Sequence, residues 1–477
     1  MSTKAQATSR LASIDVLRGV GVVLMVQLHT SHGWISADAR TGGSWSASQF
    51  WGGLAAPIFL MLAGVSLGLR WSGVLARGEQ PRLGGDLRRA LSLVVFGYLL
   101  RLQMWFIDAG GWARPDAYLA QASLAAAYAV ALLTLSRANT LLPRAAGFAG
   151  ASLLFAFGLW QTAAHAPDRL PGVLRVDVLQ CIGGSLALAV GFATWTRDLP
   201  YFVGPRLSRA SQAALRALKG DLPFLRRATR PGKRGPARSS DEIGQIPSLT
   251  RARAGFAIAA CALAFVTVWT RTWVPGPLPV AIAAYLGQWP PAPGKSVLGL
   301  FPLFPWAAYT FAGVAFGLHW GQQRAGLLQR MVLLGAVALV IALATRESGT
   351  LAHRVLDPWP WLTQPLRVLQ RVAWVLALTG ACAALSAWLP AIVAPLDTLG
   401  RASLLVYWVH LEFAFGAASS GFAKSLGITP WAVGTAGLVV AMWLVAQIRV
   451  GLSPGRSRDP VGTIDESSLP RERTTSA

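Results

Sequence analysis

The chain of 477 residues is 53% hydrophobic and only 13% charged, whereas an ordinary soluble domain has about 25% charged residues. This composition excludes a typical soluble enzyme and predicts an integral membrane protein. The formal net charge of +23 would indicate a nucleic-acid partner in a soluble chain. Here the Lys and Arg residues fall mainly in alternate loops, as the positive-inside rule describes, so we expect no nucleic-acid partner.

Apolar stretches of about 20 residues, long enough to cross the hydrocarbon core, recur from end to end. They predict an all-α fold, a polytopic membrane helix bundle of about 11–12 transmembrane helices. Twelve spans with both termini in the cytosol satisfy the distribution of basic loops. The predicted spans are 12–33, 49–71, 89–107, 116–136, 144–165, 174–196, 254–275, 297–320, 327–346, 366–389, 400–418 and 429–449.

A long polar connection, residues 197–253, separates two six-helix membrane blocks, residues 1–196 and 254–449. The connection is basic and rich in Pro and Gly, and part of it is typical of a disordered cytosolic loop. Residues 450–477 are expected to form a disordered cytosolic tail. We find no convincing repeat between the blocks, which counts against an inverted-repeat transporter. The three cysteines lie in apolar spans without paired spacing, so neither a disulfide framework nor a metal site is expected.

The first span is the richest in polar residues. Arg18 and His29 are eleven residues apart, which is three helical turns, or roughly 16 Å along one stripe. Charged groups at a helix centre cost about 2.5–3.5 kcal/mol on insertion scales, so they are functional candidates by default. The alternative is that His29 is a hydrogen-bonded structural histidine and that Arg18 pairs with Asp15 to fix topology. The residues that recur at spacings of three and four on this face are Asp15, Arg18, Val22, Met25, His29 and His32.

Other polar residues fall near the predicted outer ends of later spans. If the helices converge there, they form a chemically equipped pocket facing the outer side. The structural alternative is that Arg175 and Asp177 are helix-end groups whose side chains extend to the membrane interface, and that the FPLFPW segment serves only helix packing and interface anchoring. The outer-end candidates are Arg101, Asp108, Arg175, Asp177, Gln180, Tyr309, Tyr407, His410 and Glu412.

Five segments in order resemble the transmembrane acyltransferases. The resemblance is to the heparan-alpha-glucosaminide N-acetyltransferase catalytic-domain family in its bacterial branch, and the Arg-x10-His spacing also resembles the related acyltransferase-3 proteins. It covers residues from about 10 to 450. The segments are SIDVLRG, Arg18-x10-His29, DVLQCIG, FPLFPWAAYTFAG and LGRASLLVYWVH.

The resemblance implies acyl transfer across a membrane. The donor would be a cytosolic acyl-CoA, usually acetyl-CoA, and the acceptor an amino or hydroxyl group of a sugar or glycoconjugate on the outer side. By match to the motif, His29 would be the catalytic base, with Arg18 as its motif partner. In lysosomal members the catalytic histidine lies further along, in the first outer loop. Here that loop, residues 34–48, has no histidine, so the choice between His29 and His32 stays open.

We therefore predict an acyl-CoA-dependent transmembrane acyltransferase without a metal, multi-pass in a bacterial inner membrane, with the oligomeric state open between a monomer and a homodimer. The alternatives are a secondary transporter of a small polar or anionic solute and a non-catalytic scaffold or sensor. Asp177 is a candidate to orient the base or the acceptor, beside His29 and His32. Contacts to acyl-CoA are assigned to Arg18, Arg101, Arg175, Arg401, Tyr309 and His410.

Overall fold

A computed structural model describes a bundle of helices. In the residues that it describes there is no strand, only two isolated bridges, so the predicted all-α class is confirmed. The described residues are 12–76, 81, 83–108, 118–137, 141–165, 174–197, 247–270, 282, 285–286, 299–322, 326–347 and 363–451. The helices are α1 (Ala12–Trp34), α2 (Gly42–Gly52), α3 (Ala55–Ala76), α4 (Leu83–Asp108), α5 (Tyr118–Arg137), α6 (Leu141–His165), α8 (Val178–Arg197), α11 (Pro247–Thr270), α13 (Leu303–Gln322), α14 (Leu327–Glu347), α16 (Thr363–Trp388), α17 (Pro390–Arg401), α18 (Ser403–Phe415) and α19 (Ile428–Gly451), with a 3-10 turn, η6 (Ala417–Phe422).

Several of these helices can cross a membrane. Seven are long and apolar enough by themselves, and the pair α17 and α18, which meet at 81°, makes up to an eighth. Each of the twelve spans predicted above coincides with described helix. The chain is therefore a multi-pass membrane protein. Most of the predicted cytosolic loop 197–253 and most of the tail 450–477 lie outside the described residues. So does His353, which falls in the predicted outer loop 347–365.

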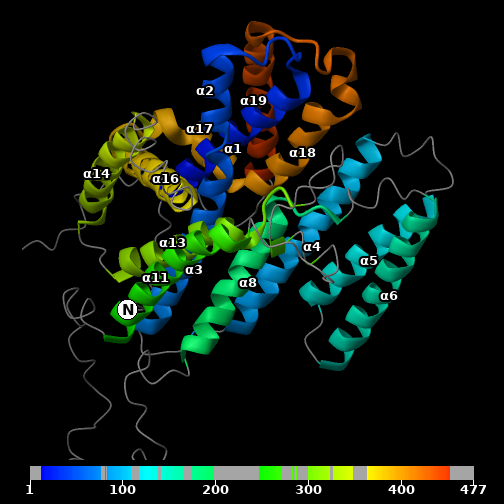
Figure 1. The fold of residues 1–477 in the computed structure, drawn as a ribbon, viewed down its shortest axis with the longest axis horizontal. Coiled ribbons are helices and arrows are strands. Elements are labelled where there is room, and N and C mark those ends of the chain that lie inside the picture. The colour runs from blue at the N-terminus through cyan, green and yellow to red at the C-terminus, as the bar shows by residue number, and fades with distance from the viewer. Residues whose placement is uncertain are drawn as a thin grey trace, which may run out of the picture.

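Helix α1 is at the centre of one half of the molecule. It contacts α2, α3, α16, α17, α18 and α19, and Figure 1 shows it enclosed by α2, α18 and α19. Two glycines let the backbones of α1 and α17 touch, because a Cβ added at Gly19 would collide with the carbonyl oxygen of Leu396, and one at Gly400 with that of Asp15. Small residues that admit a close backbone approach are typical of helix interfaces in membranes.

A second glycine interface joins α3 to α13. Gly64 and Gly68 on α3 face Gly313 and Gly317 on α13, and a Cβ at any of the four would meet the backbone of the opposite helix. Both pairs have the four-residue spacing of the small-xxx-small motif. The sequence contains this signal, although the spans were predicted above without it. The interface fixes α13, whose first turn is broken at Phe304, as the prolines at 302 and 305 predict.

The helices at the edge of the bundle are apolar on their outer faces. The α5–α6 hairpin packs beside α4, at the side of the molecule in Figure 1. On α6, Leu142 is 80% and Leu153 is 73% exposed. Large apolar side chains exposed over a whole helix are expected where lipid, rather than water, is the solvent. The exposed faces therefore outline the bilayer-facing surface.

Replacing Gly317 by Ala should destabilise the protein. The added methyl group would overlap the backbone of Val65 on α3, and overpacking of this kind costs about 1–3 kcal/mol. The matched control is Gly437→Ala on α19, where a Cβ meets no atom within 4 Å, and where the better helix propensity of Ala makes the change neutral or stabilising. The change in stability of each variant is measured as the thermal unfolding midpoint of the purified protein in detergent. Equal midpoints for the two variants would contradict the proposed interface.

Candidate active site

Two histidines from opposite ends of the chain meet beside the C-terminal end of α1. His29 Nδ1 lies 2.7 Å from His410 Nε2, and the two rings are nearly coplanar, edge to edge, with centroids 5.0 Å apart and planes within 4°. His410, on α18, is fully buried, whereas His29 is half-buried. The sequence pattern singled out both residues but assigned them to different roles. The structure makes them one unit.

The hydrogen bonds of His410 set the tautomers of both rings. His410 Nδ1 lies 2.9 Å from the carbonyl oxygen of Val406, which can only accept, so Nδ1 carries the proton. In the neutral ring Nε2 is then an acceptor, and His29 Nδ1–H donates to it. The remaining nitrogen, His29 Nε2, keeps its lone pair, and no described residue bonds to it. A half-buried imidazole with a free, unprotonated nitrogen is the requirement for a general base.

Aromatic rings surround this pair. The ring of Tyr407 on α18 is 6.3 Å from that of His29, and the ring of Phe415 is 5.7 Å from it. Both contacts are tilted, and Tyr407 is itself buried. These apolar walls hold the imidazole of His29 in one orientation and lower the local dielectric, which strengthens each polar interaction inside the site.

A charged cluster next to Tyr407 joins α4 to the start of α8. Arg101 Nη1 is 3.5 Å from Asp177 Oδ2, and the charges of both groups act on Tyr407. Arg175 is close enough for its charge to interact with both of them, and its buried Nε has no hydrogen-bond partner. Among the described residues the cluster therefore holds two guanidinium groups and one carboxylate. The structure brings Arg101, Arg175 and Asp177 together, as expected if the spans converge. In the described bonds, however, Asp177 contacts Arg101 and not His29.

Asp177 also has a structural task. Its Oδ1 accepts a bond from the backbone N–H of Val178 at 3.0 Å, and Gln180 Oε1 accepts from the N–H of Asp177 at 3.2 Å. The bond from Gln180 is one half of a capping box at the start of α8, while the carboxylate of Asp177 bonds the first backbone N–H of the helix. The DVLQ segment therefore positions Asp177 at the helix end, where its carboxylate meets Arg101.

A polar bridge links α4 directly to α18. The amide of Gln103 donates to the carboxylate of Glu412. Gln103 is a residue that the sequence reasoning missed. A glutamine inside an otherwise apolar span was the available signal, because such polar groups are retained where they line a protein interior. The side chain of Asp108, at the end of α4, lies outside the described part of the structure.

His32 belongs to a different network. It is exposed, and its Nε2 lies 2.8 Å from Gln49 Oε1 on α2, while its ring is 6.2 Å from that of Trp45. Gln49 also donates to Ser31 at 3.1 Å. Although His29 and His32 are one turn apart, the first faces α18 and the second faces α2. His32 therefore lies at the rim of the site.

The predicted cytosolic groups lie at the opposite end of α1. Arg18 is bonded to Asp15 at 2.8 Å, which confirms the predicted pair, and Arg401 to Asp397 at 2.9 Å. Between Arg18 and His29 on the same stripe, Val22 and Met25 are 1% and 4% exposed. The stripe is thus packed with side chains over its middle portion.

Tyr309 is separate from the histidine pair in its contacts. It is buried, lies against Trp306 with ring centroids 5.7 Å apart, and is close enough to Arg371 on α16 for the charge of Arg371 to act on it. Arg371 in turn sits 5.6 Å above the ring of Trp306. The predicted contact of Tyr309 with acyl-CoA therefore stays a prediction without support from the described geometry.

The comparison with protein families agrees with part of this assembly. Residues 10–170 match the family model described as heparan-alpha-glucosaminide N-acetyltransferase, catalytic. The resemblance inferred from the motifs is supported over this range, which holds Arg18, His29 and Arg101. His410, Asp177 and Arg401 lie beyond it. A comparison with curated proteins gave no match to the chain.

The tautomers can be measured directly. In protein with 15N-labelled histidine, the signals of His29 and His410 should both show the Nδ1–H form, because the bonds to Val406 and between the rings require it. Replacing His410 by Leu should remove the acceptor and shift the His29 signal. His319→Asn, at a remote site, is the control and should leave both signals unchanged. An Nε2–H form at His29 would contradict the assigned base.

Proposed function

We propose that this protein is a membrane acyltransferase that moves an acetyl group from cytosolic acetyl-CoA to an amino or hydroxyl group of a sugar or glycoconjugate at the outer side of the inner membrane, with both termini in the cytosol. The observation that carries the proposal is the Nε2 of His29, to which no described residue bonds, in an imidazole held by His410 near the cluster of Arg101, Arg175 and Asp177. The family match over residues 10–170 supports the transferase class.

In the proposed reaction His29 Nε2 takes the proton of the acceptor amine or hydroxyl as its nitrogen or oxygen attacks the thioester carbonyl. The carbonyl–sulfur bond then breaks, and the imidazolium returns the proton to the sulfur of CoA. His29 Nδ1–H stays bonded to His410 Nε2 throughout, so the positive charge formed on His29 is stabilised by a fixed acceptor. His410 is thus a positioning residue, in the way that a buried acceptor orients a catalytic histidine.

The charged cluster suits the oxyanion that forms during the attack. The cluster brings two guanidinium groups, those of Arg101 and Arg175, beside the carboxylate of Asp177. Fixed positive groups aimed at developing negative charge contribute more than any other effect to the rate of many acyl transfers. Arg101 is mostly buried, with 14% of its side chain exposed, so its charge is only weakly screened by water. Asp177 keeps this guanidinium in place.

The rim around α2 fits a sugar acceptor. His32 and Gln49 lie next to Trp45, and Gln27 donates to Ser48 at 2.6 Å while its own Oε1 has no partner. Amide groups beside this half-buried aromatic ring, over which Arg40 lies, offer hydrogen bonds to the hydroxyl groups of a sugar. We therefore assign His32 to the acceptor side.

The donor enters from the other end of α1. CoA is a polyanion, and Arg18 and Arg401, which is 43% exposed, supply cations where α1 and α17 meet. The acyl-pantetheine arm has to cover the roughly 16 Å to His29. Because Val22 and Met25 are buried on this stripe, the arm runs beside it or displaces these side chains.

Replacing His29 by Ala should lower acetyl transfer by about 10²–10⁴-fold, because the proton acceptor is lost. His32→Ala, one turn away, should keep the turnover number and raise KM for the acceptor. The assay measures release of the CoA thiol in the presence of a panel of amino and hydroxyl sugars. Equal losses in turnover for the two variants would contradict the assignment of the base.

If His410 orients His29, two substitutions of His410 should lower the turnover to different extents. His410→Gln retains an oxygen that can accept from His29 Nδ1–H, whereas His410→Leu leaves this buried donor without a partner. We expect the Gln variant to keep much more of the turnover than the Leu variant, with little difference between them in binding of acetyl-CoA. Identical activities in well-folded samples would show that His410 does not orient the base.

Binding of the donor can be tested without knowing the acceptor. Titration calorimetry of the purified protein in nanodiscs should show saturable binding of acetyl-CoA, with CoA as a competitor. Arg18→Gln should weaken it, and Arg70→Gln, which removes a cation paired with Asp86, serves as the control. Absence of binding in a folded sample would reject the acyltransferase and favour a transporter, for which the break between α17 and α18 is the kind of discontinuous span used to bind solutes.

A further inference from the structure

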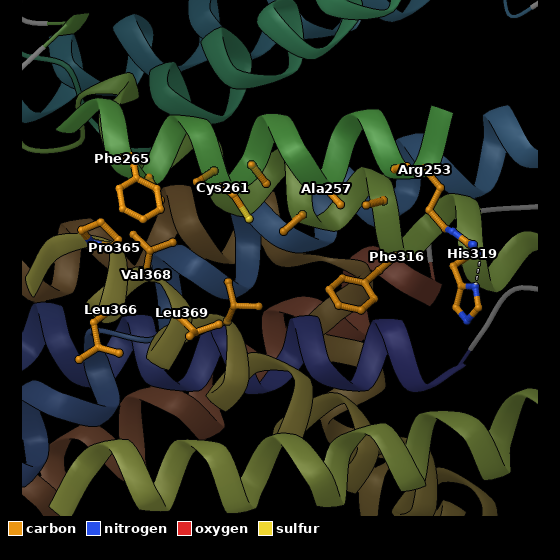
Figure 2. A pocket seen from close by; sticks show the side chains of 17 residues that line it. Arg253, Ala257, Cys261, Phe265, Phe316, His319, Pro365, Leu366, Val368 and Leu369 are labelled. Atoms are coloured by element: carbon orange, nitrogen blue, oxygen red, sulfur yellow. Dashed lines mark hydrogen bonds between the residues drawn. The ribbon is translucent and has the colours of Figure 1, made fainter. Parts of the chain in front are cut away.

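An apolar groove lies away from the candidate active site, between α11, α13 and α16. Its volume is about 770 Å³. Figure 2 shows its wall of small and aliphatic side chains, with Ala257 and Cys261 on α11 opposite Leu369 on α16. The alanines recur at spacings of three and four along α11 and α13, so each helix presents one flat, smooth face. No residue of α1, α4, α8 or α18 lines it.

The groove is open to the side. Ala257, Ile258 and Cys261 on α11 are exposed, Ile258 by 70%, in a helix that lies among membrane spans. From Ala308 to His319 the wall of α13 extends eleven residues, or about 16 Å. A lateral opening of this length at membrane depth gives access to the chains of lipids rather than to water.

One end of the groove is cationic. Arg253 Nη1 lies 2.8 Å from His319 Nδ1, as the dashed line in Figure 2 shows. Because a guanidinium can only donate, His319 Nδ1 accepts and the imidazole is neutral, so the charge of Arg253 is not cancelled. The charge of Arg330 acts on the same imidazole. Among the described residues no carboxylate forms an ion pair with Arg253.

We propose that this groove is a binding site for an anionic glycerophospholipid. One acyl chain fills the space between α11, α13 and α16, and the phosphate contacts Arg253, with Arg330 adding to the positive field. An apolar slot with a cation at its membrane boundary is complementary to a molecule that joins an acyl chain to a phosphate, and basic pockets between spans bind such head groups. A soluble anion would leave the slot empty, and an uncharged lipid would not use the cations.

Native mass spectrometry of the full-length chain in detergent tests the site, with phosphatidylglycerol and phosphatidylcholine of identical acyl chains as probes. The first phosphatidylglycerol should bind about tenfold more tightly than the first phosphatidylcholine, a difference of about 1.4 kcal/mol. Arg253→Gln should remove this preference. The matched control, Arg449→Gln near the end of α19, removes one cation outside the groove and should keep it.

A second variant tests the slot independently of the charge. Ala257→Leu places a larger side chain where the wall is open and should weaken the first binding event of both lipids, with an unchanged unfolding midpoint. Equal binding of the two lipids by the unmodified chain would overturn the proposal. So would equal binding of glycerol 3-phosphate, which carries the phosphate without acyl chains, or a preference for phosphatidylglycerol that survives Arg253→Gln.

Discussion

A polar side chain inside a membrane domain must find a partner, because the hydrocarbon offers none. The C-terminal half of α1 satisfies this constraint through bonds to α2, α18 and α19. Thr30 shares a hydrogen bond of 2.8 Å with Thr435 on α19 and accepts one of 3.1 Å from Trp431. Trp34 donates to the carbonyl oxygen of Phe413. The hydrogen-bonded histidines lie within this set of bonds, so the candidate base is held by the same contacts that hold the helices together.

Close backbone contact gives these bonds their fixed geometry. Gly33 on α1 lies against the carbonyl oxygen of Ala414 on α18, and the backbone after α1 pairs with Leu426 before α19. At the opposite end of α1, Gly19 lies against the carbonyl oxygen of Leu396 on α17, and Gly400 on α17 lies against that of Asp15. A helix held at both ends by glycines cannot slide or rotate without a clash. Preorganisation of this kind is what a site needs if one imidazole nitrogen is to face the substrate while the other stays bonded.

The sequence predicted the helices and part of the site for clear physical reasons. Span length, loop charge and spacing along one helix are local properties, so the positions of Arg18 and His29 on α1 followed from them. The sixth predicted span begins three residues before Asp177, and the assumed topology placed this residue on the same side of the membrane as Arg101. The pairing of His29 with His410 depends on how α1 packs against α18, and no local pattern contains that information. Tyr309 was assigned to the site by its depth, but its helix face turns it towards Arg371 on α16.

The separation between the two histidines has a consequence for biosynthesis. His29 and His410 are 381 residues apart, so the first imidazole enters the membrane long before its acceptor has been translated. The family match ends at residue 170, and a fragment with that boundary would hold His29 without the ring that orders it. The site is therefore completed only when the penultimate span inserts. A chain truncated anywhere before α18 lacks half of the imidazole pair, so a complete pair requires that translation has passed α18 and that α1 and α18 have packed together.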